Sequence, residues 1–161
     1  MGYHDTAQIC LNGHVINSQF KSFPEDNKKF CDKCGAKTIT SCTKCNFNIQ
    51  GNHFSGGFIR IEELNTPSFC INCGSPYPWT ESKLQAAKEL AEELELTSEE
   101  KEILLNSIMD IVKETPKTEV AITRFKKIML KMGKETSDIF RNLLIDIVSE
   151  TVKKMLWSDN K

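Results

Sequence analysis

The sequence has no run of about 18 consecutive apolar residues, the shortest length that crosses a bilayer as a helix. It also has no positively charged and then apolar segment near Met1 of the kind that directs secretion. Both absences favour a cytoplasmic protein. An excess of one charge sign is lacking as well, because 21 basic and 22 acidic residues give a formal net charge of −1. This balance disfavours a nucleic-acid binder that depends on many phosphate contacts.

Catalytic patterns are also missing. The sequence has no P-loop, no dinucleotide-binding glycine pattern and no nucleophile paired with a histidine in a recognisable motif. The glycine-containing stretch "GNHFSGGF" precedes no helix that could receive a phosphate. We therefore expect a protein that is not an enzyme.

Cysteine is abundant but confined to one part of the chain. All seven cysteines lie between Cys10 and Cys73. In a reducing compartment, so many cysteines favour metal binding over disulfide bonds, and their odd number argues against a closed disulfide framework.

Six of the cysteines form three pairs with two residues between the partners. The pairs are "CDKCG" (Cys31, Cys34), "CTKCN" (Cys42, Cys45) and "CINCG" (Cys70, Cys73). Two cysteines at this spacing on a tight turn can present both sulfurs to one tetrahedral zinc ion. The glycine or asparagine that follows each pair tolerates the positive φ that such a turn requires. Three pairs supply six ligands, whereas two zinc sites need eight.

The stretch "CLNGH" supplies the missing pair. Three residues separate Cys10 from His14, and Gly13 lies where the chain must turn sharply. We expect the two other histidines to be surface or packing residues, since His4 lies in a terminus that we expect to be frayed and His53 lies in a glycine-flanked stretch that resembles a hairpin tip. The eight predicted ligands are Cys10, His14, Cys31, Cys34, Cys42, Cys45, Cys70 and Cys73.

The four pairs can combine in more than one way. Sequential pairing joins the first pair to the second and the third to the fourth, so that each site closes a hairpin-sized loop. Interleaved pairing gives a cross-braced module, and nested pairing joins the two middle pairs across a short segment. We favour sequential pairing and leave the other two open.

The identity of the metal follows from the ligand set. Sites of four cysteines can hold iron, and paired cysteines can be redox-active. A catalytic zinc keeps an open position for water, whereas every predicted ligand is used here. We therefore predict two structural Zn²⁺ ions.

The two halves of the chain differ in composition, which predicts an α+β fold. Residues 1–75 hold all the cysteines and four short runs typical of strands: "HVINSQF", "AKTIT", "FNIQG" and "GFIRI". We expect two small zinc-ribbon modules here, because such runs are too short to bury a core unaided. Residues 76–161 are rich in Lys, Glu, Leu and Ile at helical spacing. The proline-containing "SPYPWT" joins the halves, and Tyr77 and Trp79 are expected to pack there.

The second half predicts a bundle of about four helices. The first covers about residues 81–95 with Thr80 as N-cap, and the second begins with a capping box of Thr97 and Glu100. The third has Thr115 as N-cap and ends at Gly133. The last covers about residues 136–156, with apolar side chains around half of its circumference, as expected of a central helix or of one that faces a partner.

The motifs resemble known families. "KFCDKCGAKTITSCTKCN" and "SFCINCGSPYPW" resemble the knuckles of double zinc-ribbon proteins. "ICLNGHVIN", "KFCDKCGAKTI" and "CGSPYPWT" together resemble a family of small bacterial proteins of unknown function, in which a zinc-ribbon region precedes a helical tail. The resemblance covers most of the chain and implies a bacterial cytoplasmic setting and zinc at the matching cysteines. It implies no activity. The sequence departs from the ribbon pattern at Asn46, where a glycine is usual.

Two functions remain open. The first is a zinc-stabilised adaptor or regulator that binds a protein partner through its knuckles and helices. The alternative is a nucleic-acid-binding ribbon, for which lysines near Phe20, Phe23 and Phe30 are the candidate surface. Seven basic and six acidic residues give the first half, through Trp79, a formal charge of +1. Two loaded zinc sites would lower it to about −2, so we favour the adaptor.

Overall fold

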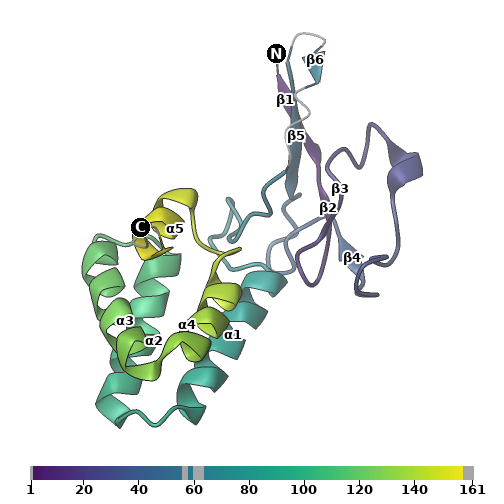
Figure 1. Cartoon of the computed structure of the whole chain (residues 1–161). Coiled ribbons are helices and arrows are strands. Elements are labelled where there is room, and N and C mark those ends of the chain that lie inside the picture. The colour runs from purple at the N-terminus through teal and green to yellow at the C-terminus, as the bar shows by residue number, and fades with distance from the viewer. Residues whose placement is uncertain (1, 56–57, 60–63, 158–161) are drawn as a thin grey trace. The chain divides into compact units, whose positions relative to one another are not determined.

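The computed structural model describes residues 2–55, 58–59 and 64–157 (Figure 1). The predicted α+β fold is confirmed: short antiparallel strands occupy the N-terminal half, and five α-helices follow in the described part of the chain. The chain forms two compact units, Met1–Glu81 and Ser82–Lys161, called here the N-terminal unit and the helical unit. None of the helices in the described ranges combines the length and apolar character that a membrane span requires.

The N-terminal unit contains two three-stranded sheets. In the first, β1 (Tyr3–Thr6) pairs with β5 (Gln50–Ser55), which pairs with β6 (Phe58–Ile59). In the second, β2 (Gln8–Cys10) lies between β3 (Val15–Asn17) and β4 (Thr38–Ile39). A short 3₁₀ helix, η1 (Pro24–Asp26), lies between β3 and β4 in the sequence. Strands β3, β4, β5 and β6 each overlap one of the four predicted runs, whereas β1 and β2 were not predicted.

His4 and His53 lie in different backbone elements from those that the sequence predicted. His4 lies in β1 rather than in a frayed terminus, and it is paired with His53 of β5. The stretch around His53 is strand rather than hairpin tip, because β5 continues to Ser55 before pairing with Phe58 of β6. Stacking of the Tyr3 and Phe54 rings, with centroids 5.1 Å apart, stabilises this outer part of the pairing.

The core of the N-terminal unit joins residues from its whole length. The buried cluster consists of Ala7, Ile9, Cys42, Ile49, Cys70, Tyr77 and Trp79. Within it the rings of Tyr77 and Trp79 stack with centroids 4.8 Å apart. The indole N–H of Trp79 donates to the carbonyl oxygen of Pro67 over 2.8 Å, so its buried polar atom is satisfied. Tyr77 and Trp79 are buried, as expected of packing residues, and they pack in the core of the N-terminal unit.

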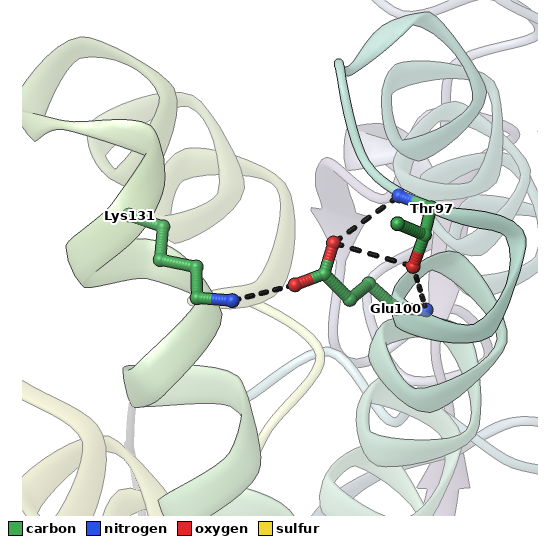
Figure 2. A network of polar contacts seen from close by, with 3 residues as sticks. All are labelled: Thr97, Glu100 and Lys131. Carbon is green, nitrogen blue, oxygen red and sulfur yellow. Dashed lines mark hydrogen bonds and ion pairs between the residues drawn. The ribbon is translucent and has the colours of Figure 1, made fainter.

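The helical unit begins within α1 (Pro78–Glu93) and continues with α2 (Ser98–Val112). Thr80 is not the N-cap of α1, because the helix already begins at Pro78 and the Glu81 N–H donates to the Tyr77 carbonyl oxygen. The predicted capping box of α2 is confirmed. The Glu100 N–H donates to Thr97 Oγ1 over 3.2 Å, and the Thr97 N–H donates to Glu100 Oε2 over 3.1 Å (Figure 2).

Helix α3 (Thr118–Met132) begins later than predicted. Its N-cap is Lys117 rather than Thr115. The Thr115 hydroxyl instead donates to Asp110 Oδ1 over 2.8 Å and accepts from the Lys117 N–H over 3.2 Å, which fixes a turn before the helix. The predicted end is confirmed at Gly133, whose φ of 84° suits glycine.

The predicted last helix is divided into α4 (Lys134–Leu144) and α5 (Glu150–Trp157). The buried apolar side chains of this region are Phe140, Leu144, Ile147, Val148, Val152 and Leu156. On one straight helix they would cover about half of the circumference, whereas the break allows all six to be buried. Ser149 begins the second segment, because its Oγ accepts from the Val152 N–H over 3.3 Å.

Candidate metal centres

The three Cys-x-x-Cys pairs form three turns of the same geometry. In each turn the residue after the second cysteine donates its N–H to the carbonyl oxygen of the first cysteine, over 2.8–2.9 Å. These residues are Gly35, Asn46 and Gly74, with φ values of 70°, 61° and 69°. Positive φ is the conformation that glycine and asparagine tolerate best. Asn46, which stands where the other two pairs have glycine, therefore forms the same turn.

A second hydrogen bond closes each turn. The N–H groups of Cys31, Cys42 and Cys70 donate to carbonyl oxygens five residues later, over 2.8–2.9 Å. Isolated antiparallel bridges flank the turns at Phe30–Lys37, Ser41–Asn48 and Phe69–Pro76. The backbone thus holds each cysteine pair on a small hairpin, which we call a knuckle.

The fourth pair lies on the connection between β2 and β3. Cys10 ends β2, and the chain turns back at Gly13, whose φ is 89°. The His14 N–H donates to Cys10 Sγ over 3.3 Å. A Cβ atom at Gly13 would lie 3.1 Å from Cβ of Trp79, so both its backbone conformation and its close packing favour glycine.

The eight predicted ligands come together in two groups of four. Centre 1 contains Cys10, His14, Cys31 and Cys34, and centre 2 contains Cys42, Cys45, Cys70 and Cys73. Within each group all the candidate ligand atoms lie within 4.8 Å of one another. The grouping follows the sequential scheme, so neither the interleaved nor the nested arrangement is formed. Each group could bind one metal ion.

The distances between ligand atoms fit a tetrahedral ion. In centre 1, Nδ1 of His14 lies 3.5 Å from Sγ of both Cys10 and Cys31, and the Sγ atoms of Cys10 and Cys34 are 3.7 Å apart. In centre 2, the Cys42–Cys73 and Cys45–Cys70 sulfur pairs are separated by 3.8 and 3.7 Å. Tetrahedral zinc with bonds of about 2.3 Å to sulfur and 2.05 Å to nitrogen places ligands about 3.8 Å (S–S) and 3.5 Å (S–N) apart.

Hydrogen bonds surround the sulfur atoms. In centre 2, the Lys44 N–H donates to Cys42 Sγ over 3.4 Å, and the Asn72 amide donates to Cys45 Sγ over 3.6 Å. Hydrogen bonds from the Ser75 side chain and backbone lower the pKa of Cys73 to about 6. This favours the thiolate, the form that binds metal.

Centre 1 has a buried and an exposed end. Burial raises the pKa of the Cys10 thiol, whereas at Cys34, which is exposed, a backbone hydrogen bond with Ala36 is the main cause of a lowered pKa. A side-chain hydrogen bond from Asn12 lowers the pKa of Cys34 further. In each centre, therefore, an asparagine within one ligand pair donates to a cysteine of the second pair of the same centre: Asn12 to Cys34 and Asn72 to Cys45.

Sequence reasoning missed the residues that contact the thiolates. Burial and the nearby Cys70, to which its hydroxyl hydrogen-bonds, raise the pKa of Tyr77. Tyr77 was predicted only as a packing residue. The contact from Ser75 could have been found by comparing the knuckles. Ser75 and Ala36 each stand two residues after the second cysteine of a pair, and each hydrogen-bonds to that cysteine. His4 and His53 belong to neither metal group in the described part of the chain.

The comparisons with known proteins give one family. Neither a curated protein nor a solved structure matches the chain. One family matches over residues 3–156, which includes both centres and all five helices except Trp157. The chain belongs to this family, described as an uncharacterized protein conserved in bacteria (DUF2321).

Proposed function

We propose that the protein is a non-enzymatic adaptor or regulator of the bacterial cytoplasm, stabilised by two structural Zn²⁺ ions and acting through a protein partner. The observation that carries the proposal is the composition of the two centres, in which four protein side chains converge at tetrahedral distances. Structural zinc sites use four protein ligands, whereas catalytic ones leave a position for water. The three-cysteine, one-histidine set of centre 1 is typical of structural zinc.

The knuckles supply the surface for a partner. Three large apolar side chains on them are exposed: Phe30 by 54%, Phe47 by 39% and Ile71 by 66%. Metal-closed knuckles hold such side chains rigidly, so binding a partner costs little conformational entropy. Aromatic and aliphatic residues of this kind contribute most of the binding free energy in protein interfaces.

A nucleic-acid surface is the second candidate, and one observation favours it. Lys29 Nζ lies 6.0 Å from the centre of the exposed Phe30 ring, and Lys37 is the bridge partner of Phe30. An exposed ring flanked by lysines can stack a base and contact its phosphates. The negative charge of a loaded centre 1 would oppose phosphate binding nearby, so we rank this candidate second.

One experiment tests both candidates. Elemental analysis of the purified chain should find two zinc ions. The variant F30A/F47A/I71A should retain them and lose a partner that the wild-type protein captures from its host. Leu130→Ala, which removes another exposed apolar side chain on α3, is the matched control and should retain that partner. The adaptor proposal fails if the triple variant captures the same proteins as the wild type. Salt-dependent binding of single-stranded DNA or RNA that Lys29→Ala weakens would favour the second candidate.

A further inference from the structure

The two histidines outside the metal centres face each other across a pair of strands. His4 of β1 and His53 of β5 are direct partners in the antiparallel pairing. Their ring centroids are 4.8 Å apart, and the ring planes are inclined at 58°. Directly opposite residues of antiparallel strands project from the same face of a sheet. The two imidazoles therefore share one face of the β1-β5-β6 sheet.

The tautomer of His4 is fixed by the backbone. Nδ1 of His4 lies 3.0 Å from the carbonyl oxygen of Gly51. A carbonyl oxygen only accepts, so Nδ1 carries the proton and donates it. In the neutral ring, Nε2 is then left with a free lone pair. Histidines that bind metals are commonly oriented in this way, with the other ring nitrogen donating to a backbone carbonyl.

The Nε2 edge of the His53 ring lies against the main chain at Gly2. A Cβ atom at Gly2 would lie 2.4 Å from Nε2 of His53, so a side chain at this position would collide with that edge of the ring. Glycine avoids the collision. His4 is exposed and His53 is half-buried, so an ion from solvent can reach the pair.

We propose that His4 and His53 form a third metal site, which binds a divalent transition-metal ion such as Zn²⁺ through one imidazole nitrogen from each ring. Imidazole is the protein ligand that suits these ions, and water completes the coordination. An ion with only two protein ligands exchanges with solvent far more readily than one with four. Its binding ties the edge strand β1 to β5. The proposal does not depend on the adaptor function.

The test is a titration of the full chain, already loaded with two zinc ions, with ZnCl₂. Calorimetry should show one additional Zn²⁺ per chain, and ¹⁵N spectra of the histidine rings should shift for His4 and His53 but not for His14. Loss of an outer contact to a metal ligand usually lowers affinity about 10- to 100-fold. His4→Ala and His53→Ala each remove a direct ligand, so each should weaken the third site by at least about 100-fold. No further binding, or binding that His53→Ala leaves unchanged, overturns the proposal.

Two further variants separate ligation from packing. Gly2→Val keeps both imidazoles but displaces the His53 ring, so it should weaken the third site as the histidine deletions do. His53→Cys replaces one metal donor by another and should retain binding, which a packing role would not predict. Gln50→Ala, on the same strand, is the control and should bind as the wild type does. Circular dichroism and an unchanged content of two tightly held zinc ions confirm folding. Wild-type affinity in Gly2→Val also overturns the proposal.

Discussion

The side-chain amide of Asn72 donates to Sγ of Cys45, 3.6 Å away on the other knuckle of centre 2. Cys45 and Asn72 thus connect two segments that are 27 residues apart in the chain. Because the amide favours the thiolate form of Cys45 and orients its sulfur, this contact should slow the loss of a bound ion.

Replacement of Asn72 by Ala should increase the rate of zinc release from centre 2 by about tenfold or more. Transfer of zinc to a coloured chelator measures this rate, and only one of the two zinc ions should be affected. Asn48→Ala removes an exposed asparagine beside the same centre and is the matched control. Equal rates in the two variants would contradict a role for the amide.

The metal centres were more predictable than the strands. Cysteine pairs at fixed spacing and a glycine or asparagine after each pair are local features, so the sequence alone indicated the eight ligands. Strands β1 and β2 were missed because their buried residues include polar side chains satisfied by distant partners. Gln8 Nε2, for example, donates to the Lys28 carbonyl oxygen over 2.9 Å, and Gln8 Oε1 accepts from the Lys28 N–H over 3.0 Å. Strand prediction relies on the spacing of apolar residues along the sequence, and that spacing carries no information about hydrogen bonds to distant residues.

The break between α4 and α5 was also not predictable from local pattern. Residues 145–149 contain no proline or glycine, so no residue type marks the end of a helix there. Two residues of the break, Ile147 and Val148, are buried, at 3% and 7% exposed. Tertiary packing therefore overrides helical propensity at this point.

Removal of zinc should unfold the N-terminal unit and leave the helical unit folded. A structural zinc ion contributes about 10–16 kcal/mol of binding free energy, which is as large as the whole stability of a typical domain at about 5–15 kcal/mol. Trp79 is 4% exposed in the core of the N-terminal unit and should become exposed to water. A chelator should shift the Trp79 fluorescence to longer wavelength in a Trp157→Phe variant, while the helical circular-dichroism signal persists. Unchanged fluorescence after complete zinc removal would show that the core forms without metal.

Asp5 should stabilise the N-terminal unit at neutral pH. It is 4% exposed, and its carboxylate accepts from the N–H groups of Thr6, Lys21 and Ser22. Burial alone would raise the pKa of Asp5, but hydrogen bonds, chiefly from the Ser22 side chain, outweigh it and lower the pKa. The folded-state pKa is below the unfolded value, so the stabilisation is present above about pH 4 and is lost as pH falls through the folded-state pKa.

Asp5→Asn should therefore lower the free energy of unfolding by about 1–3 kcal/mol, because one carboxylate oxygen becomes an amide nitrogen that cannot accept and the other oxygen loses its charge. Denaturant unfolding at pH 7 and at pH 5, both with zinc present, measures the loss, which should be the same at the two values. Asp32→Asn removes an exposed carboxylate that pairs with Lys28 and should have a much smaller effect. A loss that disappears already at pH 5 would contradict a lowered pKa for Asp5.

Thr97 should matter more to the helical unit than Lys131, although both contact Glu100 (Figure 2). The Thr97 hydroxyl accepts from a backbone N–H at the start of α2, and loss of such a cap costs about 1 kcal/mol. Lys131 Nζ lies 2.5 Å from Glu100 Oε1, but its side chain is 63% exposed, and exposed ion pairs add little stability. Thermal unfolding should show a lower midpoint for Thr97→Ala than for Lys131→Ala, with Thr97→Ser close to the wild type. In high salt the small effect of Lys131→Ala should vanish while that of Thr97→Ala remains, because salt screens the ion pair and leaves the cap intact.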